Sequence, residues 1–213
     1  MTSTITLGGN SVPLVALPSS PGPRSVDFTF SDSVAVVRSP FTGQTQVQQW
    51  PGADMLIATV TLPRLTQTQA DAWISFLMEL RGMANAFQIG DPLKSAPTGV
   101  ATGTPVVGTT YMTTMGTVLY SSGWSASTTG LLLPGDYVQV GYRLYRVLDK
   151  VTSDSSGNAP ITIWPSLREV PTSGTAIIVN NPVGLWRLSD NKRMWSFDET
   201  RLTSISFHIM EYR

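Results

Sequence analysis

Residues Thr66–Gly82 read TQTQADAWISFLMELRG, the pattern of one amphipathic helix in a chain otherwise rich in strand patterns. Thr66 and Gln69 have the spacing of a capping box, in which two side chains satisfy free backbone amides at the start of a helix. Gly82 can adopt the left-handed conformation that ends a helix. The sequence therefore predicts a helix over 67–81, with Trp73 on the apolar face that covers a sheet.

The segments on both sides of this helix have strand patterns, with strict alternation of apolar and polar residues in 26–30 and 203–211. The strand patterns lie at residues 26–30, 34–37, 44–50, 55–62 and 203–211. We expect one face of each of the first two strands to be buried, whereas the glutamine-rich third strand should be exposed. The last segment places Ile205, Phe207 and Ile209 on one face. Because these side chains need a sheet to lie on, we expect the C-terminal segment to return to the first sheet.

A second unit follows a turn-rich linker near residue 95. Residues 131–148 predict two strands about a tight turn at Gly141, and 161–164 and 176–179 predict two more. Short strands of this kind are typical of a small barrel or sandwich. We therefore predict a mainly β, α+β chain with two domains. Residues 1–95 and 183–213 form a β-sandwich flanked by one α-helix, and residues 96–182 form an inserted small β-barrel or sandwich domain.

The composition and charge of the chain argue against several classes of function. Fourteen basic residues balance fourteen acidic ones, and charged residues make up only 13% of the chain. Because Lys and Arg form no cluster, we expect no specific nucleic-acid partner. The chain has no cysteine, which excludes disulfides and thiolate metal sites. No stretch approaches the roughly 18 apolar residues of a membrane span, so we expect no membrane insertion.

The residues whose side chains could act in catalysis or metal binding are scattered along the chain. His208 is the only histidine and is out of phase with the apolar residues around it, so we expect a surface or interface histidine. Asp136 follows Pro134-Gly135 and should fix a turn, and the stretch Asp154–Asn158, which lacks the further acidic ligands of a calcium loop, predicts a hairpin turn. We predict no enzyme activity, no catalytic residue, no cofactor and no metal site. A small glycan hydrolase stays an alternative, because spacing alone cannot exclude two facing carboxylates.

Several motifs, taken in order along the chain, resemble tail proteins of long-tailed bacteriophages. They are PFTGQTQ (40–46), the strand end Leu62-Pro63, the Trp73 helix, FQIGDP (87–92) and LPGDY (133–137). From about residue 36 to the end, the chain most resembles distal tail proteins, the ring components that join the tail tube to the baseplate or tail tip. A tail-tube subunit or another small baseplate protein would show nearly the same patterns.

The resemblance implies a tail-tube-like fold and a homo-hexameric ring around a central channel in the virion tail, after synthesis in the host cytoplasm. The implied partners are the tail tube protein, the tape-measure protein, and the tail hub or baseplate proteins and fibres. The protein would then have a structural role in the virion and no catalytic one.

Two surfaces are candidates for contacts. Gln44, Gln46, Gln48 and Gln49 are a candidate ring or channel interface, because a conduit for DNA should not bind phosphates tightly. The candidate docking surface of the insertion consists of Trp124, Tyr142, Arg143, Tyr145 and Arg146. The same aromatic residues support an alternative function as a carbohydrate-binding module, in which Trp124 or Tyr145 would stack on a sugar.

Overall fold

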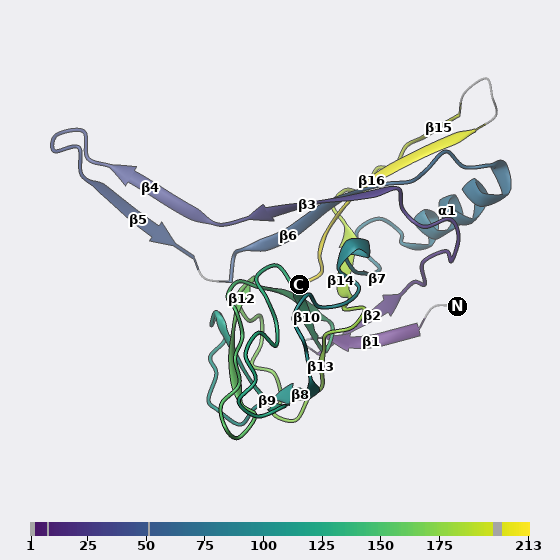
Figure 1. The fold of residues 1–213 in the computed structure, drawn as a ribbon. Coiled ribbons are helices and arrows are strands. Elements are labelled where there is room, and N and C mark those ends of the chain that lie inside the picture. The colour runs from purple at the N-terminus through teal and green to yellow at the C-terminus, as the bar shows by residue number, and fades with distance from the viewer. Residues whose placement is uncertain (1–2, 8, 51, 198–201) are drawn as a thin grey trace. The chain divides into compact units, whose positions relative to one another are not determined.

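The computed structural model describes residues 3–7, 9–50, 52–197 and 202–213 (Figure 1). The chain is mainly β with one α-helix, which confirms the predicted fold class. Its elements are, in chain order, β1 (Ser3–Leu7), β2 (Asn10–Leu14), β3 (Ser25–Ser31), β4 (Val34–Arg38), β5 (Thr45–Gln49), β6 (Met55–Thr61), α1 (Gln67–Glu79), β7 (Phe87–Ile89), the short 3-10 helix η1 (Pro92–Lys94), β8 (Gly103–Val107), β9 (Val118–Trp124), β10 (Tyr137–Val140), β11 (Arg143–Val147), β12 (Ala159–Trp164), β13 (Ile177–Ile178), β14 (Gly184–Leu188), β15 (Trp195–Phe197) and β16 (Thr203–Glu211).

The chain forms two compact units. Unit 1 comprises Met1–Thr29, Leu56–Leu93 and Val183–Arg213, and unit 2 comprises Phe30–Met55 and Lys94–Pro182. The second unit therefore starts close to the predicted insertion boundary. The prediction differs in placing residues 30–55 with the first domain. The described contacts group this segment with the second unit, for reasons given below.

Unit 1 is built on a sheet with the strand order β3-β6-β16-β14-β7, and β15 also pairs with β16. The C-terminal strand β16 lies between β6 and β14, so the predicted return to the first sheet is confirmed. The register sets Val60 of β6 opposite Phe207, and Ala58 opposite Ile209. Directly opposed residues share a face of the sheet. All four of these side chains are buried, so this is the covered, apolar face.

Helix α1 covers this apolar face. The ring of Trp73 lies 5.6 Å from Phe76 and 6.2 Å from Phe207, and Phe76 lies 5.4 Å from Phe87 on β7. The predicted capping interaction is present, since the Thr66 amide donates to the side-chain oxygen of Gln69 at 3.1 Å.

The helix ends at Glu79, two residues before the predicted end. Arg81 already has a φ of 48°, which is outside the helical region, and Gly82 follows with the predicted left-handed φ of 76°. A Cβ at Gly82 would meet the end of the Asn191 side chain, which can move aside, so the positive φ is the main reason for glycine here. The two left-handed residues together set the end of the helix.

Unit 2 contains a nearly closed barrel. Its sheet has the order β13-β10-β11-β12-β9-β8, and the ends meet where Val107 donates to the Thr175 carbonyl and Gly174 donates to the Val107 carbonyl, both at 2.8 Å. The predicted hairpin at Gly141 joins β10 to β11. The barrel core consists mainly of aliphatic side chains and includes Leu119, Leu131, Leu132, Val138, Tyr145, Val147, Ile161 and Ile163.

Strands β4 and β5 form a separate two-stranded ribbon in unit 2. The segment before the ribbon is tied to the barrel by Trp164, whose ring lies 5.0 Å from that of Phe30 and whose Nε1 donates to Asp32 at 3.0 Å. These contacts join residues that are more than 130 positions apart, so a local sequence pattern does not show them. They explain why residues 30–55 group with the inserted unit.

Candidate functional site

The β4–β5 ribbon has two different faces. Val36 is paired with Val47, Val34 with Gln49 and Arg38 with Thr45 on what we call the valine face (Val34, Val36, Arg38, Thr45, Val47 and Gln49). The opposite, glutamine face consists of Ala35, Val37, Gln46 and Gln48. The exposed fraction is 45% for Val34 and 62% for both Val36 and Val47. A strand expected to bury one face therefore buries neither in the single chain.

The four predicted glutamines are all exposed but do not form one surface. Gln46 and Gln48 share the glutamine face, whereas Gln49 lies on the valine face. Gln44 precedes β5, in the turn where its carbonyl accepts a hydrogen bond from Ser39 at 2.8 Å. Neighbouring residues of a strand point to opposite sides, so a continuous run of polar residues divides between two faces.

The ribbon has the properties of a surface that a partner covers. An isolated two-stranded hairpin is at best marginally stable in water. Among the described residues, β4 and β5 pair only with each other, so each strand keeps one edge open for further pairing. Phe41 at the tip is 96% exposed, and Trp50 at the other end is 50% exposed. Burying one valine side chain contributes roughly 1.5–3 kcal/mol, which favours association through this ribbon.

A partly buried ion pair fixes the segment that follows the ribbon. The carboxylate of Asp54 accepts hydrogen bonds from the Ser166 amide at 2.6 Å, the Ser166 hydroxyl at 2.8 Å and Arg168 at 3.2 Å. Arg168 also donates to the Gly52 carbonyl at 3.0 Å. Burial by itself raises the pKa of Asp54, but the hydrogen bonds from Ser166 and the charge of Arg168 outweigh it and hold the pKa below its usual value.

This carboxylate makes the anchoring of the ribbon sensitive to acid. Because the pKa of Asp54 is lower in the folded chain than in the unfolded chain, its stabilisation is present above about pH 4 and is lost as the pH falls through the folded pKa. We expect Asp54→Asn to lower the free energy of unfolding of unit 2 by about 1–2 kcal/mol at pH 7 and to weaken its dependence on acid. Urea denaturation at several pH values measures both effects. Equal acid sensitivity in wild type and variant would contradict the assignment, and Asp149→Asn at an exposed position is the control.

Three of the five residues predicted to form the docking surface of the insertion are buried. Trp124 is 5% exposed, Arg143 7% and Tyr145 2%. The Trp124 Nε1 donates to Ser121 at 2.7 Å, inside the barrel. In a closed barrel one face of every strand points inward, and Trp124 and Tyr145 lie on that face. The prediction was therefore wrong for these residues, and so was the version of a carbohydrate-binding module that relied on them.

The remaining two candidates are half-buried. The guanidinium of Arg146 lies 5.5 Å from the Phe30 ring and 5.4 Å from the Tyr137 ring, in cation–π geometry. Arg146 therefore packs between the segment before the ribbon and strand β10, and only part of its side chain contacts solvent. Tyr142 lies in the hairpin turn after Gly141.

His208 and Asp154 form hydrogen bonds with neighbouring residues of the fold. His208 is exposed as predicted, on the polar face of the unit 1 sheet, where its Nδ1 lies 2.9 Å from the Thr59 hydroxyl. Asp154 forms the predicted turn by accepting from the amides of Ser156 and Asn158, both at 2.8 Å. No cluster of three His, Cys, Asp or Glu side chains suited to a metal ion occurs among the described residues.

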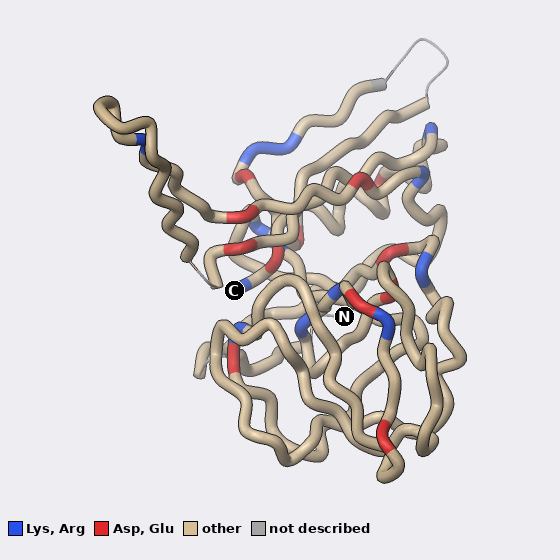
Figure 2. Tube along the Cα trace, turned by 60° about the vertical axis from the view of Figure 1, so that its left-hand side comes forward, with Lys and Arg blue, Asp and Glu red and all other residues tan. Residues whose placement is uncertain are grey.

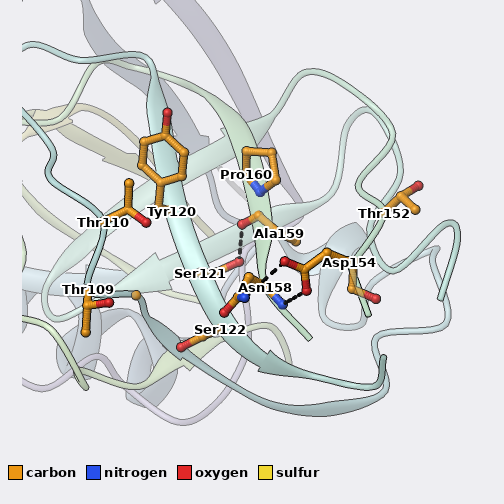
Figure 3. Close-up of a pocket in the computed structure, with 12 residues that line it drawn as sticks. Thr109, Thr110, Tyr120, Ser121, Ser122, Thr152, Asp154, Asn158, Ala159 and Pro160 are labelled. Carbon is orange, nitrogen blue, oxygen red and sulfur yellow. Dashed lines mark hydrogen bonds between the residues drawn. The ribbon is translucent and has the colours of Figure 1, made fainter. Parts of the chain in front are cut away.

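The residues that line a depression on unit 2 (Figure 3) are not indicated by the sequence patterns. Its floor is formed by Tyr120 on β9 and Pro160 on β12. Strand β9 was not predicted, because the inward position Ser121 is polar and breaks the hydrophobic alternation. The visible signal was Leu119 between two outward residues, Val118 and Tyr120.

No model of a known protein family matches the chain, and no curated protein matches it.

In the part of the chain that the structure describes, no helix is long and apolar enough to cross a bilayer.

Proposed function

We propose that this chain is a non-enzymatic structural subunit of a phage tail, which closes into a homo-hexameric ring at the distal end and links the tail tube to the baseplate or tail tip. The observation that carries the proposal is the β4–β5 ribbon, which exposes its valine face in the single chain. The motifs that resemble those of distal tail proteins also support the proposal, because such proteins form rings in which a neighbouring subunit could cover the ribbon.

The partner that covers the valine face is a neighbouring copy of the same chain. Head-to-tail contacts between identical subunits close into a ring when the rotation between them permits. Arg38, at the end of the valine face, is its charged residue, whereas the chain as a whole has no net charge and long stretches without any charged residue (Figure 2). The two open edges of the ribbon also allow backbone pairing with the neighbour.

The glutamine face has a different role in the proposed ring. Gln46 and Gln48 are polar and uncharged, so they hydrate a surface without binding phosphates. Such a surface suits a channel that admits the tape-measure protein and then DNA. The tail tube protein and the tail hub or baseplate proteins are the proposed neighbours of the ring in the virion tail.

Two substitutions of the same kind on opposite faces test this proposal. We expect Val36→Glu to abolish assembly, because burial of the new carboxylate on the valine face is unfavourable. Gln46→Glu adds the same charge on the glutamine face and should leave the ring intact. Light scattering on both purified variants measures the mass, and circular dichroism verifies their folding. Equal assembly of both variants would show that the valine face is not the contact between subunits.

A further inference from the structure

Both ends of the β4–β5 ribbon contact the same short piece of the barrel, residues 164–168, which we call the clamp segment. It starts at the last residue of β12 and is rooted in the barrel core, because Ile163 before it and Leu167 within it are buried there. The Leu167 amide donates to the Gly116 carbonyl at 2.8 Å, and the Met115 amide donates to the Leu167 carbonyl at 2.7 Å. The clamp segment is therefore a fixed part of the barrel wall.

The chain that enters the ribbon is held by Trp164. The indole Nε1 donates to the Asp32 carboxylate at 3.0 Å, and the ring meets the Phe30 ring edge to face at 5.0 Å. Arg146 is the cross-strand partner of Trp164 on β11, and its guanidinium lies 5.5 Å from the Phe30 ring. Phe30 thus packs on two directly opposed side chains of the barrel, which fixes the path of the chain before β4.

The chain that leaves the ribbon is held by Ser166 and Arg168. The buried Ser166 hydroxyl accepts from the Gly52 amide at 3.0 Å and donates to the Asp54 carboxylate at 2.8 Å, so one hydroxyl bridges two residues of this chain. Arg168 donates to the backbone carbonyls of Gly52 and Asp54. Because these bonds reach the backbone as well as a carboxylate, they fix the path of the chain after β5.

The two ends of the ribbon are also bonded to each other. The Trp50 amide donates to the Ser33 carbonyl at 3.1 Å, directly beyond the last strand pair, Val34 with Gln49. The ribbon is therefore one hairpin that is attached to the barrel at two separate points. A single attachment would let the hairpin rotate about it, whereas two attachments along the clamp segment leave the hairpin one direction.

We propose that the clamp segment sets the direction in which the ribbon leaves the barrel, and through it the angle between neighbouring copies in the ring. Trp164, Ser166 and Arg168 are positioning residues, because they act through the ribbon. Head-to-tail contacts close into a ring only at a suitable rotation between subunits and otherwise form open chains. The effect on the ring rests on the proposed function, whereas the effect on the ribbon is a property of the single chain.

The distance between two spin labels measures the direction of the ribbon. The chain has no cysteine, so Gln46→Cys on the ribbon and Ser155→Cys in an exposed turn of unit 2 introduce two unique labelling sites. Labelled chain diluted with excess unlabelled chain reports distances within one copy, whether the protein is monomeric or assembled. We expect a single narrow distance distribution from electron paramagnetic resonance when the clamp segment is unchanged.

Two conservative substitutions weaken the two attachments. Trp164→Phe keeps an aromatic ring and removes the hydrogen bond to Asp32, and Ser166→Ala removes the bridging hydroxyl. We expect the double variant to raise the population of released, broadly distributed ribbon about tenfold or more, and each single variant to raise it less. Val170→Ala, just beyond the clamp segment and 50% exposed, is the control and should keep the narrow distribution. Circular dichroism verifies that each variant is folded.

Negative-stain images of the unlabelled double variant test the consequence for assembly. Its valine face is unchanged, so copies should still associate, but as open or irregular chains in place of closed rings. The proposal is overturned by a broad distribution in the unchanged chain, by a double variant that stays narrow, or by a released ribbon that still closes into rings. An unchanged chain with a narrow distribution and no ring refutes the proposed function and supports the clamp in the single chain.

Discussion

Replacing Trp73 with alanine should lower the free energy of unfolding of unit 1 by about 3–5 kcal/mol, the cost typical of a large aromatic side chain removed from a core. Trp73 is 1% exposed and contacts both Phe76 on its own helix and Phe207 on β16. Its Nε1 also donates to the Pro21 carbonyl at 3.2 Å. The substitution therefore opens a cavity between helix and sheet and removes a hydrogen bond to the segment before β3.

Amide hydrogen exchange in β16 under native conditions measures this loss, because the central strand of unit 1 exchanges through its unfolding. Met78→Ala is the matched control. Met78 lies on the same helix but is 61% exposed, so its truncation should change stability by less than about 0.5 kcal/mol. Similar losses for the two variants would contradict the placement of α1 on the sheet.

Asp136→Ala should destabilise unit 2 by about 3–5 kcal/mol. The carboxylate is fully buried and accepts hydrogen bonds from the amides of Thr98 at 2.8 Å, Gly99 at 3.2 Å and Leu133 at 2.9 Å. Lys94 lies 3.7 Å away. Alanine would leave three backbone donors without an acceptor at the point where the chain enters the barrel. The predicted role of Asp136 in fixing the Pro134-Gly135 turn is confirmed by the bond to Leu133.

The ionisation of Asp136 supports the same expectation. Burial raises its pKa, but the amides of Leu133, Thr98 and Gly99 more than compensate and hold the pKa below its usual value. The carboxylate therefore stabilises unit 2 at neutral pH and loses this effect on strong acidification. Thermal denaturation at pH 7 tests the variant. Asp154→Ala, which also removes acceptors of backbone amides but from an exposed turn, should show a much smaller loss. Equal melting temperatures for wild type and Asp136→Ala would contradict the network.

Local signals in the sequence predict the parts of the fold that depend on neighbours along the chain. The capping box at Thr66 and the alternation in 203–211 identify the helix and the central strand, because each pattern comes from contacts within the element or with one sheet face. The hairpin at Gly141 follows from turn chemistry in the same way.

Long-range contacts explain what the sequence does not show. The short apolar run of residues 34–37 correctly indicates a strand, but it cannot show that no described part of the chain covers that strand. The sequence around Trp124 and Tyr145 does not show that both side chains lie in the core of the barrel, because the strands that enclose them are distant in the chain. The buried Ser121 hides strand β9, because a polar inward residue is tolerated only through its bonds to Ala159 and Trp124.

The solution mass of the purified wild-type chain, measured by light scattering over a concentration series and followed by negative-stain imaging, distinguishes a hexameric ring from a monomer. We expect a species six times the 23.0 kDa of one chain, with ring-shaped particles. A chain that stays monomeric at every concentration, with its valine face uncovered, would contradict it.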